Sequence, residues 1–239
     1  MPVTQTQKKI SVQSLLYDSD RERIVATVLR MGELVSTALE VAVHAFFDLD
    51  REAAGRVIRN DDLIDSLEEE VDQECLGSIA MRSPRKEELY FVFAVLKIIT
   101  DLERIGDQAV NIAKKVFQLT ETMEFPRKEC ILLMTDKVLS MFSDALEAFR
   151  TGDGKMASEL WKRDDEVDEM YAECYSDFLE NAMAGTHSGP EAVKVGALEL
   201  WAARHLERAG DHVINIAERV FFMVEGKYFP SKEERKKTI

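Results

Sequence analysis

The chain has 239 residues, enough for one large domain or for two domains of roughly 100–150 residues, each with its own buried core. Its 45 Asp and Glu residues outnumber its 31 Lys and Arg residues, which gives a formal net charge of -14. This charge argues against direct binding to nucleic acid or to anionic lipid, and it favours cations or basic proteins as partners.

The cysteines and the apolar runs indicate the compartment. Cys75, Cys130 and Cys174 are scattered, odd in number and without Cys-x-x-Cys spacing, which is typical of reduced thiols rather than of a disulfide framework. We interpret them as small core residues. The N-terminus lacks a continuous apolar segment, and no uninterrupted apolar run approaches the roughly 20 residues of a membrane span. We therefore expect a soluble, cytoplasmic protein.

The first half of the chain shows helical periodicity after a polar start. Residues 1–18 are polar and irregular, which predicts a loose N-terminal arm. Apolar residues then recur at steps of three and four from Ile24 to Phe46, as on one face of a long helix. Ser83-Pro84 predicts a later break, because proline cannot continue a helix. The helices expected here span residues 19–49, 51–81 and 86–122.

Phe125-Pro126 ends this half, and the sequence then repeats itself. A period near 100 residues is too long for a solenoid repeat and indicates a duplicated domain. Helices are expected over residues 127–150, 154–184 and 190–226. Acidic residues return at a spacing of 103 residues, or 104 in the last helix: Asp61 as Asp164, Asp65 as Asp168, Glu103 as Glu207, and Asp107 as Asp211.

Strand signals are nearly absent from the sequence, since it has no sustained alternation of apolar and polar residues and no Asn-Gly hairpin. We therefore predict an all-α protein of two tandem three-helix bundles related by internal duplication. The bundles are expected over residues 19–124 and 125–226, between the N-terminal arm of residues 1–18 and a polar C-terminal tail of residues 227–239.

Each half carries an Asp-x-x-x-Asp pair on its second helix and a Glu-x-x-x-Asp pair on its third. A spacing of four puts both carboxylates of a pair on one side of a helix. If the two helices pack antiparallel, four carboxylates converge on one groove. A site with only oxygen donors suits hard cations such as Mg²⁺, Mn²⁺, Ca²⁺ or iron. The sequence thus offers one candidate metal site in each half.

Solvated acidic faces are the alternative to metal sites. A like-charge pair at this spacing costs about 0.2–0.5 kcal/mol in a helix, so four pairs cost about 1–2 kcal/mol in all. A protein tolerates that cost without a cation, so repulsion alone does not decide between the two interpretations. The return of both pairs at equivalent positions in both halves keeps the metal sites open.

The sequence contains none of the common catalytic motifs that we searched for. None of the four histidines forms Glu-x-x-His, the di-iron signature of ferritin-like bundles. The sequence also lacks a Gly-rich phosphate loop, a Ser-His or Cys-His nucleophile motif and a zinc motif.

Gly106 and Gly210 lie inside segments with a helical pattern, which predicts close approach of a neighbouring helix. Asn111 and Asn215, one turn after the aspartates, either bond a carboxylate or ligand or face solvent.

The doubled stretch Leu-Glu-Arg-x-Gly-Asp-x-x-x-Asn-Ile-Ala begins at Leu102 and again at Leu206. Together with the Asp-x-x-x-Asp segments before it, this stretch resembles the PhoU family of phosphate-transport regulators across nearly the whole chain. The resemblance implies two tandem three-helix bundles with metal clusters of iron or zinc. It places the metal ligands on Asp61, Asp65, Glu103 and Asp107 in the first bundle, and on Asp164, Asp168, Glu207 and Asp211 in the second.

The resemblance also implies a role without catalysis. Such proteins repress phosphate-starvation signalling by linking a high-affinity phosphate importer to its sensor kinase, and they restrain phosphate uptake. We therefore expect contacts with the ATPase subunit of the phosphate ABC importer and with the phosphate sensor histidine kinase. The protein would meet the membrane only through these partners and form a homodimer. The alternatives are a carboxylate-bridged metal-dependent enzyme or metal-storage bundle, and a plain helical adaptor.

Overall fold

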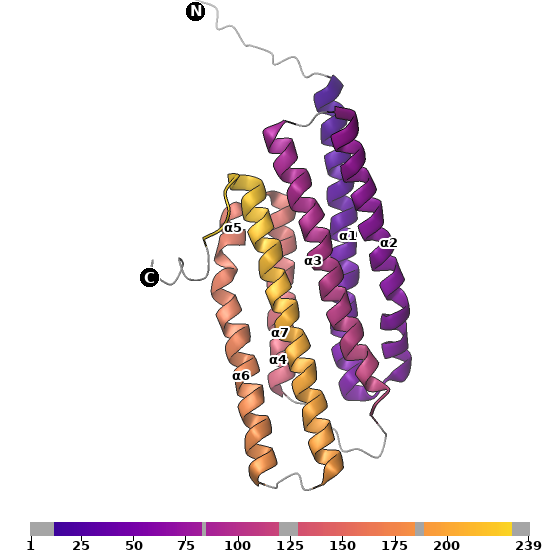
Figure 1. Cartoon of the computed structure of the whole chain (residues 1–239), viewed down its shortest axis with the longest axis vertical. Helices are drawn as coiled ribbons and strands as arrows, with labels where there is room; N and C mark the ends of the chain where they lie inside the picture. The colour runs from indigo at the N-terminus through magenta and orange to yellow at the C-terminus, as the bar shows by residue number, and fades with distance from the viewer. Residues whose placement is uncertain (1–11, 83–84, 120–128, 185–188, 231–239) are drawn as a thin grey trace, which may run out of the picture.

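The computed structural model describes residues 12–82, 85–119, 129–184 and 189–230, and within these ranges the chain is helical with no strand (Figure 1). The prediction of an all-α fold is confirmed. The helices are α1 (Val12–Asp48), α2 (Arg51–Arg82), α3 (Lys86–Val116), α4 (Glu129–Thr151), α5 (Gly154–Glu159), α6 (Trp161–Ala184) and α7 (Pro190–Glu225).

The helices form two bundles that lie side by side. In Figure 1, α1, α2 and α3 make one bundle, and α4 to α7 make the other. The predicted pair of bundles is therefore confirmed. Helices α3 and α7 make the most extensive contact of the molecule, and α1 also packs on α4. As a result, one continuous apolar core runs through both bundles. None of the described helices is both long and apolar enough to cross a membrane.

The first helix starts earlier than predicted. Helix α1 begins at Val12, so the loose arm is wrong for residues 12–18, and residues 1–11 lie outside the described part of the chain. No Gly or Pro interrupts the sequence between Val12 and Met31. Val12, Leu15 and Leu16 also keep the spacing of three and four. The sequence therefore allows the helix to extend back to Val12.

The third helix ends earlier than predicted, at Val116 instead of residue 122. Two tighter bonds close it, from the N–H of Gln118 to the carbonyl of Lys115 at 2.9 Å and from Leu119 to Val116 at 3.2 Å. Side chains then satisfy the next carbonyls: Lys194 donates to the carbonyl of Gln118, and Arg51 to that of Leu119, each at 3.0 Å. Donors from other helices thus take over the bonds that a longer helix would make. The other predicted residues, 120–122, lie outside the described ranges.

The helix predicted over residues 154–184 is divided at Leu160. Asp153 caps its start by accepting hydrogen bonds from the backbone N–H groups of Lys155 at 3.0 Å and Met156 at 2.9 Å. Around the division the backbone bonds span three residues instead of four, from Leu160 to Ala157 and from Arg163 to Leu160. The short α5 therefore ends in a tight turn, and α6 begins directly after it.

Gly106 and Gly210, the two glycines of the repeated stretch, lie where a neighbouring helix packs against their own helix. A Cβ atom on Gly106 would lie 3.1 Å from the Ile64 side chain, and one on Gly210 would lie 3.4 Å from Val167. Ile64 and Val167 are equivalent positions of the repeat. The predicted close approach is confirmed at Gly106 and reaches ordinary contact at Gly210. Both glycines bring α3 towards α2 and α7 towards α6, next to the predicted carboxylate sites.

Candidate metal centre

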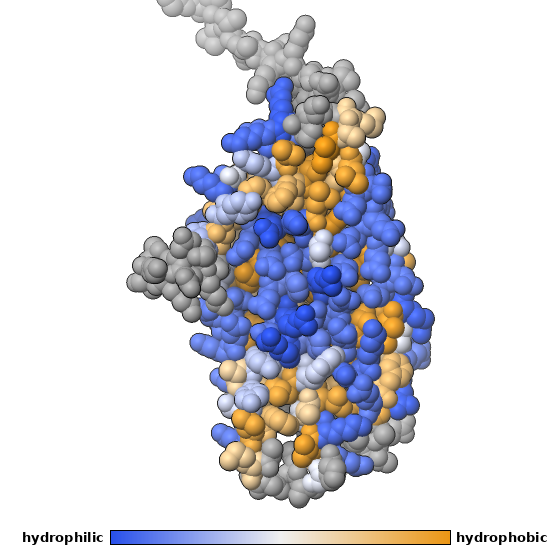
Figure 2. Space-filling view, in the orientation of Figure 1, coloured by the Kyte–Doolittle hydropathy of each residue, from blue (hydrophilic) through white to orange (hydrophobic). Residues whose placement is uncertain are grey.

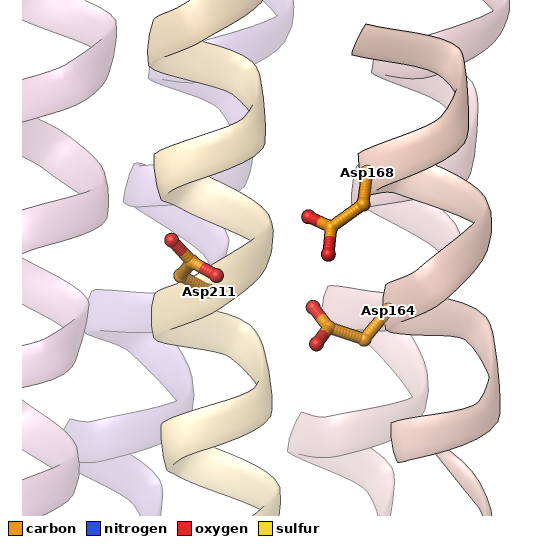
Figure 3. Close-up of side chains that lie close together, drawn as sticks. All are labelled: Asp164, Asp168 and Asp211. Atoms are coloured by element: carbon orange, nitrogen blue, oxygen red, sulfur yellow. The ribbon is translucent and has the colours of Figure 1, made fainter. Parts of the chain in front are cut away.

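Three carboxylates of the second bundle meet between α6 and α7 (Figure 3). Asp164 and Asp168 lie one helical turn apart on α6, and Asp211 faces them from α7. Each of the three offers an oxygen, and these three oxygens all lie within 4.8 Å of one another. Oxygens at this spacing can bind a single cation, and carboxylates are the ligands that hard cations prefer.

The carboxylates in this cluster repel one another. Burial raises the pKa of Asp211 above its ordinary value, and the charges of Asp164 and Asp168 raise it further. Burial likewise raises the pKa of Glu207, with Asp211 adding to the shift. Both shifts mean that the ionised forms of these carboxyl groups are less favourable in the folded protein than in water. A bound cation would stabilise the ionised forms, because it attracts the negative charges that now face each other.

Glu207, the fourth predicted ligand of this bundle, lies beside the cluster with one oxygen engaged. Arg204 donates a hydrogen bond to its Oε1 at 2.5 Å. The other oxygen, Oε2, is buried, and no described residue donates a hydrogen bond to it. A buried carboxylate oxygen without a donor is unfavourable unless a cation or water satisfies it. The residues of this cluster therefore fit a metal ion in their donor chemistry.

The equivalent residues of the first bundle are arranged differently. Among the described residues, Asp61, Asp65, Glu103 and Asp107 do not bring three oxygens together as the second bundle does. Arg104 instead forms ion pairs with Glu103 and with Asp107, each at 3.3 Å. The four carboxylates still influence each other: burial raises the pKa of Asp61, and the charges of Asp65 and Asp107 add to the shift.

A second difference between the bundles was missed by the sequence reasoning. In the first bundle the Thr100 hydroxyl donates a hydrogen bond to Glu68 at 3.2 Å, and burial raises the pKa of that carboxyl. In the second, the equivalent positions hold Arg204 and Tyr171, with the guanidinium 5.6 Å from the ring centroid. The repeat spacing contains this signal, since it aligns Glu68 with Tyr171 and Thr100 with Arg204.

Polar side chains also join the two bundles across the contact between α3 and α7. His212 donates from Nδ1 to Asp101 at 2.9 Å, and Asn215 donates to the same oxygen at 3.1 Å. Of the two alternatives left open for Asn215, the structure thus has the bond to a carboxylate. His205 donates from Nδ1 to Gln108 at 2.6 Å. Asp101 and His205 are equivalent positions of the repeat, as are Gln108 and His212, so the contacts follow the internal duplication.

His205 is a buried histidine, only 6% exposed. Burial lowers its pKa to about 4, and the nearby positive charges of Arg208, Lys115 and Arg204 contribute to this shift. His205 therefore stays neutral at neutral pH.

Figure 2 shows hydrophilic side chains across the middle of the face on which α3 and α7 lie, with apolar groups towards both ends. Gln108 and His205 are both buried, so their contact is not part of this surface.

One domain family matches the chain twice. The PhoU domain matches residues 28–116, within the first bundle, and residues 131–220, within the second. A phosphate-specific transport system accessory protein PhoU homolog from Clostridium acetobutylicum is 34% identical over 215 residues, which is 89% of this chain and 95% of that protein. The homolog from Pseudomonas aeruginosa is 34% identical over 211 residues, or 88% of this chain and 86% of that protein.

Solved structures show the same arrangement of helices. The phosphate transport system regulatory protein PhoU from Streptococcus pneumoniae matches with a TM-score of 0.82 and 27% identity, over 90% of this chain and all of that chain. PhoU from Pseudomonas aeruginosa matches with a TM-score of 0.81 and 33% identity, over 88% of this chain and all of that chain. The likeness thus extends over both bundles.

Proposed function

The chain belongs to the PhoU family, and from this premise we propose that it regulates phosphate transport and does not catalyse a reaction. The observation that carries the proposal is the match of both bundles to the PhoU domain, together with relatives that cover most of the chain. Those relatives are named accessory or regulatory proteins of phosphate transport. A regulator of this kind acts by binding other proteins.

The finer proposal concerns the partners. The protein, as a cytoplasmic homodimer, contacts the ATPase subunit of the phosphate ABC importer and the phosphate sensor histidine kinase, and it keeps phosphate-starvation signalling repressed when phosphate is plentiful. The names of the relatives support an association with the phosphate-specific transport system. The excess of acidic residues, with a net charge of -14, favours basic surfaces on these partners.

The third part of the proposal concerns metal. In the second bundle, Asp164, Asp168 and Asp211 hold iron or zinc, with Glu207 Oε2 as a further donor. The same oxygen donors accept Mg²⁺, Mn²⁺ or Ca²⁺. In the first bundle, Asp61, Asp65, Glu103 and Asp107 hold a second metal ion once Arg104 has moved away from two of them. A bound cation supplies positive charge that joins α6 to α7, and the chain's own carboxylates position it.

The regulatory role is tested by deleting the gene. In phosphate-replete cells the deletion should raise the expression of phosphate-starvation genes, because their repressor is gone. A plasmid copy of the wild-type gene should restore repression, and measurement of transcript levels checks both results. Unchanged expression in the deletion strain would reject the regulatory role.

The partners are tested separately. A tagged full-length protein, purified gently from its own cells, should bring down the importer's ATPase subunit or the sensor kinase, as identified by mass spectrometry. An untagged strain is the control for background binding. If neither protein is enriched, the proposed contacts are wrong, even if the deletion changes gene expression.

The metal proposal is tested by elemental analysis of protein purified without chelator. Replacing Asp164 and Asp211 with Ala should remove the metal of the second bundle, and replacing Asp65 and Asp107 should remove that of the first. Circular dichroism checks that each variant is folded. Equal metal content in the wild-type protein and in both double variants would reject metal binding at these carboxylates.

A further inference from the structure

Two cysteines of the second bundle lie in direct contact. Cys130, near the start of α4, and Cys174, on α6, place their Sγ atoms 2.8 Å apart, and both are thiols in the structure. Cys174 is 7% exposed, whereas Cys130 is half-buried. The third cysteine, Cys75, is completely buried in the first bundle. The chain thus contains a dithiol and a single separate thiol that serves as an internal control.

We propose that Cys130 and Cys174 are an oxidation site, at which a peroxide converts the two thiols into a reversible disulfide between α4 and α6. The inference does not depend on the proposed role in phosphate transport. A disulfide requires sulfur atoms about 2.05 Å apart and closely spaced Cβ atoms. The sulfur atoms here already touch, so only a small movement of the two side chains separates the dithiol from the bond.

The accessibility of the two thiols determines the order in which they react. Cys130 is the more accessible thiol, so its sulfur attacks a peroxide oxygen, the O–O bond breaks, and a sulfenic acid and one water form. The Cys174 sulfur then attacks the Cys130 sulfur, forms the S–S bond and releases the hydroxyl group as a second water. In total the two thiols lose two protons and two electrons, and hydrogen peroxide is reduced to two waters.

Cys174 suits the second step. Its hydrogen bond with Cys130, and then burial, raise the pKa of Cys174. Cys174 therefore remains a protonated thiol at neutral pH and is a poor first target for an oxidant. It reacts only when an oxidised sulfur lies directly beside it, as Cys130 does. The contact geometry, and not intrinsic reactivity, makes this pair distinct from Cys75.

The bond would fasten α6 to α4. Cys130 and Cys174 are separated by 44 positions in the sequence, so the disulfide closes a long loop that contains α5 and most of α4 and α6. Closing a loop restricts the unfolded chain and stabilises the folded one. Because α6 also carries Asp164 and Asp168, oxidation would restrict the helix that supplies two of the three clustered aspartates.

The test treats the reduced full-length protein with hydrogen peroxide and measures its intact mass without reductant. The expected result is a loss of two hydrogens per chain, a proteolytic fragment that joins Cys130 to Cys174, and reversal by dithiothreitol. The midpoint of thermal unfolding should rise by about 5–15 °C on oxidation. Hydrogen exchange in α4 and α6 should become slower.

Three variants complete the test. Cys130→Ser and Cys174→Ser should lose the mass change and the thermal shift, whereas Cys75→Ala should keep both. Cys130 is half-buried, so its variant remains informative if Cys174→Ser fails to fold. The proposal is overturned if the folded wild-type protein keeps its mass, gains oxygen atoms only, or forms disulfide-linked dimers in place of the internal bond.

Discussion

The two bundles of this protein repeat the same helices but present their carboxylates differently. In the second, Asp164, Asp168 and Asp211 converge between α6 and α7. In the first, Arg104 forms ion pairs with two of the corresponding acidic residues. In both bundles a glycine packs against an aliphatic side chain of the neighbouring helix, Ile64 in the first and Val167 in the second. Duplication has preserved the packing, while the surrounding side chains have changed the electrostatics.

The neighbouring side chains show how this happens. The first bundle adds a carboxylate, Glu68, bonded to Thr100. The second has Tyr171 and Arg204 instead, and Arg204 also binds Glu207. Two substitutions therefore remove one negative charge and add one positive charge close to the second set of carboxylates. They explain why the sites can differ in cation affinity although all four acidic positions are retained.

The largest expected effect tests whether the two bundles contribute equally to the shared core. Phe46 and Phe149 occupy the same position of the repeat and are 0% and 2% exposed. Replacing either with Ala should lower the free energy of unfolding by about 3–5 kcal/mol, because a large buried side chain leaves a cavity. Urea denaturation measures both losses. A loss in one variant but not in the other would show that the bundles contribute unequally to the core.

The next effect concerns the contact between the bundles. Gln108→Leu removes the acceptor of the His205 Nδ1 hydrogen and leaves that group buried and unsatisfied. The free energy of unfolding should fall by about 1–3 kcal/mol. Gln118→Leu, at an exposed position, is the control and should stay within about 0.5 kcal/mol of the wild type. Equal effects of the two variants in urea denaturation would contradict the importance of the His205 contact.

Arg204 tests the difference in charge directly. Arg204→Thr gives the second bundle the residue of the first and releases Glu207 from its ion pair. Cation affinity at the second site should then rise about 5- to 10-fold, since one positive charge near the site is removed. Thr100→Arg is the matched change in the first bundle and should weaken its site. Calorimetric titration measures both, and an unchanged affinity in Arg204→Thr would rule out competition by this arginine.

The smallest expected effect is a pH dependence of the metal-free protein. The pKa values of Asp211 and Glu207 are raised in the folded state, so the folded protein binds more protons than the unfolded chain above the ordinary carboxyl pKa. Their contribution to stability is therefore present below that pKa and is lost as pH rises through the raised value. Urea midpoints with chelator should show this loss in the wild type and a smaller loss in Asp211→Asn. Identical pH profiles would contradict it.

The helical period and the repeat predicted most of the fold because both depend on local sequence. The spacing of three and four fixes which side of a helix is apolar, and the duplicated acidic pairs fixed which carboxylates share a side. The end of α3 was not predictable in this way. It depends on Lys194 and Arg51, which reach the carbonyls of Gln118 and Leu119 from other helices.

The candidate site was predicted only in part for the same reason. Helix spacing placed Asp164, Asp168 and Asp211 on facing sides of their helices, but it could not show that Arg104 binds the acidic residues of the first bundle. The contact of His212 with Asp101 joins residues 111 positions apart. No local pattern specifies such a contact. Comparing the two halves position by position would have revealed the exchange of Glu68 for Tyr171.

The most direct test of a metal centre in the second bundle is an anaerobic calorimetric titration of chelator-treated protein with Fe²⁺. It compares the wild type with Asp211→Asn and with the matched variant Asp107→Asn of the first bundle. Loss of a clustered ligand should weaken the site of the second bundle at least about 100-fold in Asp211→Asn, whereas Asp107→Asn should leave that site within about 10-fold of the wild type. Equal weakening in the two variants, or none in Asp211→Asn, would contradict the account.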